Sequence, residues 1–303
     1  MSTLTQRKVP GKAEDVSPPA VSSDPPEKKA EDRSAKFKTH PPQLKSHKVF
    51  VRIVLAGSVF AMVYFMSNKE KTSTLAGYKE DIPLREHKLI CSADSFTEAE
   101  FEKHPKCISA CKRFVTDNLM NENEIEQLQE LARKLFQNHD ESSEIYHINS
   151  NSIALDDVTK SIHDTIKSIQ PKIIENIAQR FEISHNLLYI TSPTYFSKIT
   201  NITTEYSESM HRHHYDKEIK KNVHYTVIIF LSNYKRNFHG GRFIFVEFEK
   251  KKKKNHIVDP KAGRVVVYSA GGENTHVLEN ILNGNLVSLT LSFTCEHEET
   301  TER

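Results

Sequence analysis

The chain has 303 residues, of which 37% are hydrophobic, and this content suffices for one domain of ordinary size with additional segments. Its 42 Lys and Arg residues nearly balance its 40 Asp and Glu residues, so the formal net charge is +2. A charge this small, without a basic nucleic-acid-binding motif, excludes nucleic acid as a partner.

Residues 1–48 are rich in Pro, Ser, Lys and Glu and contain few large apolar residues. Such a segment cannot bury enough apolar surface to offset the conformational entropy that ordering costs. We therefore expect residues 1–48 to form a disordered tail.

Residues 49–67, VFVRIVLAGSVFAMVYFMS, are nearly all apolar and long enough to cross the hydrocarbon core of a lipid bilayer. The run begins too late for a cleavable signal peptide, so it predicts an uncleaved signal anchor. A buried helix of a soluble domain is the alternative. Lysines are denser before the run than after it, which predicts a cytosolic N-terminus and places 68–303 in the secretory lumen or outside the cell.

The four cysteines support this topology because all of them follow the apolar run. An even number of cysteines on one side of a membrane favours disulfides in an oxidising compartment, with three pairings open. Half a zinc site at Cys107 and Cys111 is the less favoured reading. Asn201 begins the chain's one glycosylation sequon, on the same side. The candidate disulfide residues are Cys91, Cys107, Cys111 and Cys295. Together these features predict a single-pass type II membrane glycoprotein.

Two organisational segments follow the span. Residues 68–115 are expected to form a polar stalk, up to about residue 88, and then a cysteine-rich irregular segment. Residues 116–186 carry two apolar stripes at helical spacing and are expected to form a helical support. The stripes are Ile125, Leu128, Leu131, Leu135 and Phe136, and then Ile162, Ile166, Ile169, Ile173, Ile177 and Phe181, with Pro171 expected to kink or divide the second helix.

The segment 187–297 changes character to short β-branched and aromatic runs separated by Gly, Asn or Lys clusters. This pattern predicts an all-β barrel or jelly roll behind the helices, and hence an α+β chain. The lysine run EKKKKKN, 249–255, lies between two such runs and is interpreted as a solvated hairpin tip, with an anionic partner as the alternative.

A candidate metal site is formed by His214, Asp216 and His276. His214-x-Asp216 precedes one predicted strand, and His276 lies 60 residues after Asp216, between two others. Two imidazoles and one carboxylate on one face of a metal form the facial triad of non-haem Fe(II) oxygenases. The alternatives are polar loop residues and a zinc hydrolase site. A hydrolase is weaker because no general base is evident beside the three residues.

The frame HxD … GGRF … PKAGRVVVY … ENTH … LTLSF resembles the prolyl 4-hydroxylase-like branch of the 2-oxoglutarate- and iron-dependent dioxygenases, over roughly residues 88–296. The resemblance implies a double-stranded β-helix, which is a jelly roll, and iron ligands at His214, Asp216 and His276. It also implies hydroxylation of a protein or peptide, coupled to decarboxylation of 2-oxoglutarate, with ascorbate keeping the iron reduced.

The chain departs from this family where an Arg or Lys normally pairs with the far carboxylate of 2-oxoglutarate. Asn285 and Leu286 occupy those positions, and Phe230 replaces a partner Tyr. Tyr225 and Ser288 are the candidate replacements for binding the co-substrate, with His224 beside them, whereas Arg264 is expected to be structural. Because a buried carboxylate without a partner is costly, a catalytically degenerate binding module is the alternative function.

Overall fold

The computed structural model describes residues 46–66, 71–92, 102, 107, 110–137, 144–148, 157–249 and 252–296. The chain divides into two compact units, Met1–Ser67 and Asn68–Arg303, and each is described by itself. The tail predicted for 1–48 lies outside the described residues, apart from 46–48.

The first unit contains one helix, α1 (Ser46–Met66), which covers most of the predicted span 49–67. Within the described residues it is the one helix that is long and apolar enough to cross a membrane, over His47–Tyr64. Within the described residues, large apolar side chains such as Phe50 and Phe60 are exposed on this helix.

The second unit is mostly β-sheet, arranged as two stacked sheets and one short pair. The larger sheet has the strand order β2 (Arg85–Leu89), β3 (Cys111–Thr116), β10 (Val265–Ser269), β6 (Tyr225–Phe230), β13 (Leu286–Thr294), β5 (Tyr189–Ile199) and β4 (Glu144–His147). The smaller sheet has the order β1 (Lys71–Ala76), β9 (Lys252–Val258), β8 (Phe243–Glu249) and β11 (His276–Leu278), and β7 (Phe238–Gly240) pairs with β12 (Ile281–Gly284).

From β5 onward the chain alternates between the two sheets. β5, β6, β10 and β13 lie in the larger sheet, whereas β8, β9 and β11 lie in the smaller one, and an antiparallel bridge from His214 to His276 extends the smaller sheet by one position. This winding is the jelly-roll arrangement predicted for the segment 187–297.

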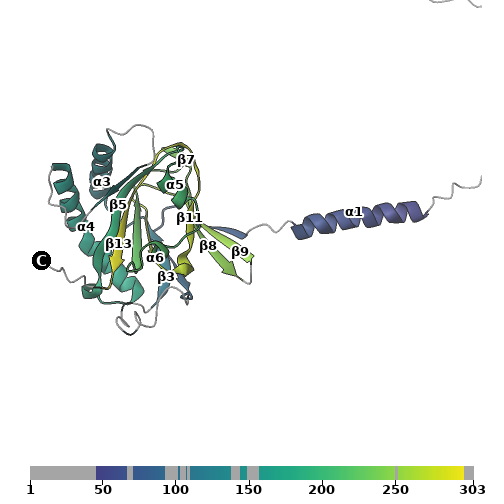
Figure 1. The fold of residues 1–303 in the computed structure, drawn as a ribbon, viewed down its shortest axis with the longest axis horizontal. Helices are drawn as coiled ribbons and strands as arrows, with labels where there is room; N and C mark the ends of the chain where they lie inside the picture. Colours follow the sequence, from purple (N-terminus) through teal and green to yellow (C-terminus); the bar gives the residue numbers. More distant parts are fainter. Residues whose placement is uncertain are drawn as a thin grey trace, which may run out of the picture. The chain divides into compact units, whose positions relative to one another are not determined.

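Helices cover the outer face of the larger sheet. α3 (Glu122–Leu135) and α4 (Asp157–Phe181) pack beside β5 and β13, as Figure 1 shows, and both predicted apolar stripes contribute to this core. α4 continues through Pro171, so the proline does not divide the helix, and the kink expected as the alternative stays a prediction. The short helices are η1 (His185–Leu187), α5 (Glu205–Met210), α6 (Asp216–Ile219) and η2 (Gly272–Asn274).

Side-chain alternation along the strands separates two apolar cores. On β6, Val227 and Ile229 face the helices, whereas Ile228 and Phe230 face the space between the sheets. The second core therefore fills the interior of the jelly roll, and it is there that side chains from both sheets can meet.

The polar stalk predicted for residues 68–88 is wrong. Residues 71–76 and 85–89 are the strands β1 and β2, which pair with β9 and β3. Each is the edge strand of its sheet, so many of its side chains face solvent. Their polar sequences resemble a stalk because an edge strand need not bury both faces. In the lysine run, Glu249 of β8 pairs with Lys252 of β9, and residues 250–251 lie outside the described residues.

All four cysteines are paired in disulfides, Cys91 with Cys111 and Cys107 with Cys295. The first closes a separation of 20 residues and the second a separation of 188 residues. The second joins the segment before the sheets to the end of β13.

Removing the long-range disulfide is expected to destabilise the fold more than removing the short-range one. The Cys107→Ala/Cys295→Ala variant should lose about 2–4 kcal/mol of unfolding free energy, because the longer loop gains more entropy when the unfolded chain is released. Urea unfolding without reductant measures this loss, with Cys91→Ala/Cys111→Ala as the comparison. An equal or larger loss in the comparison variant would contradict the expectation.

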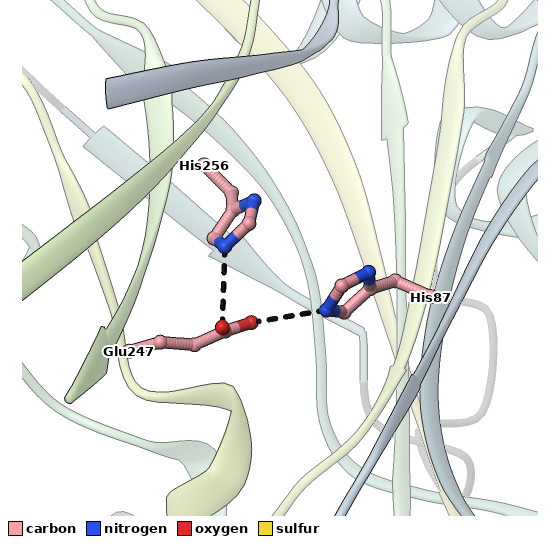
Figure 2. A group of neighbouring side chains, drawn as sticks. All are labelled: His87, Glu247 and His256. Atoms are coloured by element: carbon pink, nitrogen blue, oxygen red, sulfur yellow. Dashed lines mark ion pairs between the residues drawn. The ribbon is translucent and has the colours of Figure 1, made fainter. Parts of the chain in front are cut away.

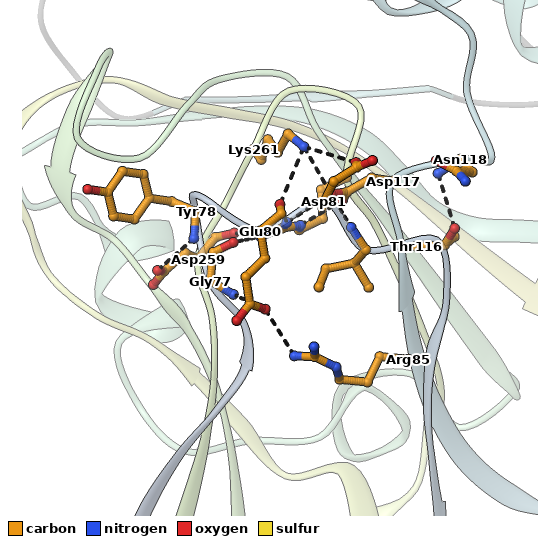
Figure 3. A network of polar contacts seen from close by, with 12 residues as sticks. Gly77, Tyr78, Glu80, Asp81, Arg85, Thr116, Asp117, Asn118, Asp259 and Lys261 are labelled. Carbon is orange, nitrogen blue, oxygen red and sulfur yellow. Dashed lines mark hydrogen bonds and ion pairs between the residues drawn. The ribbon is translucent and has the colours of Figure 1, made fainter.

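Arg264 has the structural role that its sequence context predicted. Its guanidinium is fully buried and donates two hydrogen bonds to Asp117, at 2.8 and 2.9 Å. It also donates to the carbonyl oxygens of Gly77, Glu80 and Asp259. Figure 3 shows the surrounding network, in which Lys261 reaches Asp117. Arg264 thus connects the loop after β1 to the start of β10.

Candidate metal centre

Two chain segments bring the predicted metal ligands together. The backbones of His214 and His276 exchange two hydrogen bonds, of 3.1 and 2.9 Å, at the edge of the smaller sheet. Asp216 begins α6, two residues after His214. One ligand atom from each residue lies within 4.8 Å of the other two.

Both imidazole rings are oriented by their Nδ1 atoms. His214 Nδ1 lies 2.9 Å from the carbonyl oxygen of Arg212, and His276 Nδ1 lies 2.9 Å from that of Asn274. A carbonyl can only accept, so each Nδ1 carries the proton and each Nε2 keeps its lone pair. His214 Nε2 is buried and has no hydrogen-bond partner within the described residues. This nitrogen is available to a metal ion.

Neighbouring groups position the Asp216 carboxylate, and burial keeps the His276 imidazole neutral. Thr226 donates a hydrogen bond of 2.8 Å to Asp216 Oδ2, and the Tyr268 hydroxyl also hydrogen-bonds Asp216. Burial lowers the pKa of His276 to about 4, with the His214 ring adding to the effect and the Asp216 charge opposing it. His276 is therefore neutral at physiological pH, as a metal ligand must be.

The three residues lie at one end of a cavity of about 40 Å³ between the sheets. Cross-strand partners line its floor in rows: Thr290 with Tyr195, Ser288 with Ser197, and Leu286 with Ile199. Phe230, Phe243 and Leu278 close the apolar side. Within the residues that the structure describes, the cavity lining contains hydroxyl groups but neither Lys nor Arg.

Sequence comparison identifies relatives over most of the chain. A rat protein described as "2-oxoglutarate and iron-dependent oxygenase domain-containing protein 3" is 30% identical over 278 residues, covering 83% of this chain and 86% of the relative. The human protein of the same description is 31% identical over 226 residues, covering 68% of each chain. The chain belongs to this oxygenase family.

Other comparisons are more limited. Human prolyl 3-hydroxylase 2 is 33% identical over 72 residues, which cover 24% of this chain and 10% of that protein. A 2OG-Fe(II) oxygenase family oxidoreductase from Burkholderia pseudomallei superimposes with a TM-score of 0.47 at 13% identity, covering 69% of this chain and 96% of that one. A Pseudomonas putida prolyl-4-hydroxylase gives a TM-score of 0.41 at 14% identity, covering 61% and 93%. No protein-family model matches the sequence.

Family membership confirms the resemblance read from the HxD … ENTH frame and implies Fe(II) and 2-oxoglutarate. The residues present fit an Fe(II) ion: two Nε2 atoms and one carboxylate converge, and the Nε2 of His214 is buried without another partner. This donor set matches the facial triad that non-haem iron oxygenases use.

The structure shows which of the two positions without the expected Arg or Lys, Asn285 or Leu286, faces the cavity. Leu286 is buried and lines the cavity, whereas Asn285 lines a separate groove beside α3. Phe230 also lines the cavity. The polar anchor is therefore absent at Leu286 and Phe230, whose side chains both lie on the inner face of the larger sheet.

Of the predicted replacements for binding the co-substrate, the structure places one in the cavity. Ser288 lines it, with its hydroxyl 2.8 Å from that of Ser197. Tyr225 lies on the opposite face of the sheet, packed on Phe181, with its hydroxyl donating to the carbonyl of Cys107. The placement predicted for Tyr225 is wrong because Tyr225 shares the helix-facing side of β6 with Val227. His224 does not line the cavity either.

Two tyrosines of the oxygenase cavity were not predicted from the sequence. Tyr195 and Tyr206 line it with their rings edge to face, 6.1 Å apart, and their hydroxyls are hydrogen-bonded. Burial raises the pKa of both phenols, so they remain protonated donors. Alternation along β5 from Ser197 could have indicated Tyr195, but Tyr206 lies in α5 and no local pattern pointed to it.

Proposed function

We propose that the protein is an Fe(II)- and 2-oxoglutarate-dependent dioxygenase that hydroxylates a side chain of a protein or peptide. His214, Asp216 and His276 would hold the iron. The observation that carries the proposal is the convergence of three ligand atoms within 4.8 Å, with a buried and unpartnered Nε2 on His214. Bound Fe(II) would supply oxygen activation, with electrons taken from 2-oxoglutarate and ascorbate keeping the iron reduced.

The remaining residues of the cavity would bind the co-substrate through hydroxyl groups instead of a cation. Tyr195 and Tyr206 are protonated donors because burial raises their pKa, and Ser197, Ser288 and Thr290 line the same floor. Hydrogen bonds to a charged group each contribute about 1.5–3 kcal/mol, so two or three hydroxyls could offset the lost cation. Thr226 would keep Asp216 in position.

A groove of about 220 Å³ supports a peptide side chain as the substrate. It opens beside Asp216 and is lined mainly by apolar groups, among them Ile145, Pro193 and Val223. Such a lining suits an unactivated aliphatic C–H bond. The local similarity to prolyl 3-hydroxylase 2 makes proline the first substrate to test.

The cellular setting is part of the proposal. Helix α1 would anchor the chain in the bilayer as a type II membrane protein, with the oxygenase unit in the secretory lumen or outside the cell. Two disulfides and an exposed Asn201, which begins the sequon, support an oxidising compartment and a glycoprotein.

A degenerate module that binds a partner without turnover is the second candidate. The absence of Lys and Arg from the described cavity lining, at Leu286 above all, favours it. The cavity of about 40 Å³ also requires side chains to move before a dicarboxylate can enter.

One assay separates the two functions. The full chain in detergent is incubated with Fe(II), ascorbate and 2-oxoglutarate, and succinate formation is followed. Turnover that His214→Ala abolishes supports the dioxygenase. Metal binding without succinate, and without a thermal shift from a non-reactive 2-oxoglutarate mimic, supports the module and rejects the enzyme.

Introducing a cation at Leu286 tests how the co-substrate is bound. Leu286→Arg is expected to lower the KM for 2-oxoglutarate about 10- to 100-fold, because a charge-assisted hydrogen bond is worth about 1.5–3 kcal/mol. Succinate formation at varied 2-oxoglutarate measures the change. Leu286→Met, of similar volume and no charge, is the control and should leave the KM unchanged. An unchanged KM in a folded Leu286→Arg variant would place the far carboxylate elsewhere.

A further inference from the structure

A second cluster of metal-binding side chains lies apart from the iron triad. His87 comes from β2 of the larger sheet, whereas Glu247 and His256 come from β8 and β9 of the smaller sheet. Figure 2 shows both imidazoles directed at the one carboxylate. The cluster therefore joins the two sheets.

The spacing of the ligand atoms matches one small cation. His87 Nε2 lies 3.4 Å from Glu247 Oε1, and His256 Nε2 lies 3.2 Å from Glu247 Oε2. All three ligand atoms lie within 4.8 Å of one another. Ligands about 2.0–2.1 Å from a tetrahedral zinc are about 3.4 Å apart, so little movement is required.

His256 is oriented toward the cluster and lacks another partner there. The ring is buried, and its Nδ1 lies 2.8 Å from the Ser73 hydroxyl on the neighbouring strand β1. Its Nε2 makes no hydrogen bond within the described part of the chain, although it faces Glu247. The Ser73 hydroxyl thus holds the far nitrogen of His256, as an outer hydrogen-bond partner orients the histidine ligand of a metal site. His87 is about a third exposed and provides access from solvent.

The charged neighbours leave part of the carboxylate free. Arg113 pairs with Glu247 Oε1 and lies over the ring of Phe245, and Lys254 is opposite Glu247 in the strand register. The second oxygen, Oε2, faces His256. Burial and the Arg113 charge lower the pKa of both imidazoles to about 4, so both keep a lone pair at neutral pH.

We propose that His87, Glu247 and His256 form a second site, for a divalent cation of the zinc class, that links the two sheets of the jelly roll. Two imidazoles and one carboxylate suit zinc, whereas calcium and magnesium prefer all-oxygen ligand sets. Arg113 would orient the ligating carboxylate of Glu247 without being a ligand itself. The bound ion fastens the edge strand β2 to β8 and β9.

Zinc binding to a chain that lacks the first site tests the proposal. The full chain carrying His214→Ala and His276→Ala is purified in detergent without reductant, because free thiolates bind zinc. It is stripped with chelator, titrated with zinc sulfate, and desalted. Mass spectrometry of the metal is expected to find about one zinc per chain, and the melting temperature is expected to rise with zinc.

Adding His87→Ala to this background is expected to weaken zinc binding more than about 100-fold and to remove the thermal shift, because a ligand matters more than its outer partners. Glu247→Gln should act in the same direction. His239→Ala, which removes an exposed histidine of β7, is the matched control and should keep the zinc. His87 is partly exposed, so its variant should fold. No zinc in the background chain, or equal zinc after His87→Ala, overturns the proposal.

Discussion

Replacing His276 by Ala is expected to lower succinate formation by more than about 100-fold, because even the outer partners of metal ligands are worth 10- to 100-fold in affinity or activity. His276 is buried, and its Nδ1 is held by the Asn274 carbonyl, so the substitution removes an imidazole whose Nε2 is already oriented toward the site. The loss should appear equally in Fe(II) binding measured by titration, since the imidazole acts by holding the metal.

A control must distinguish loss of the metal from loss of the fold. His239→Ala removes an exposed histidine bonded to Asn283 and should leave Fe(II) binding and succinate formation unchanged. Circular dichroism should show that the His276→Ala variant is folded. A folded variant that retains both Fe(II) binding and turnover would exclude His276 as a ligand.

Replacing Arg264 by Ala is expected to lower the free energy of unfolding by about 3–5 kcal/mol, because it removes the buried guanidinium that pairs with Asp117 and leaves this carboxylate with Lys261 and the Ile82 amide alone. Five hydrogen bonds are lost, two to Asp117 and three to backbone carbonyls of the loop after β1 and the end of β9. Urea unfolding measures the change. Arg264→Lys should recover only part of it, since an ammonium cannot bridge both carboxylate oxygens and the carbonyls.

Arg133→Ala is the matched surface control. Arg133 makes two hydrogen bonds to Glu130 at 2.7 Å on the exposed face of α3, and solvent screens this pair. Its removal should leave the unfolding midpoint unchanged. Equal effects of the two arginine substitutions would show that the Arg264 network contributes nothing beyond a surface ion pair.

The Arg264 network should also make the free energy of unfolding decrease at acidic pH. Burial raises the pKa of Asp117, but hydrogen bonds from Arg264, the Ile82 amide and Lys261 outweigh it, so the pKa lies below the ordinary value of 3.8. The unfolded chain therefore binds this proton first, and the stabilisation is present above that value and is lost as the pH falls. Asp117→Asn should remove this part of the acid dependence, as urea unfolding at several pH values would measure.

The two long helices of the oxygenase unit, α3 and α4, and the strands β5, β6, β8, β10 and β13 follow from local periodicity. The stripe from Ile162 to Phe181 and the β-branched runs after residue 187 are read directly, because the buried face of each element repeats along the chain. The edge strands β1 and β2 could not be predicted from apolar periodicity, because much of their surface faces solvent and not a core. Pro171 does not divide α4, because packing of the helix on the sheet outweighs the local cost of proline.

The sequence by itself determined the apolar span and the pair His214 and Asp216, because each lies within one short stretch of the chain. It also determined the fold class and the family frame, because both consist of short local patterns placed along the chain. Tertiary structure alone decided that Leu286 and not Asn285 faces the cavity, that Tyr225 faces away, and that Tyr206 faces in. It also decided that His87 meets Glu247 and His256. The physical reason is register: a shift of one residue between paired strands moves every side chain to the opposite face, and only the packed sheets determine which face meets which.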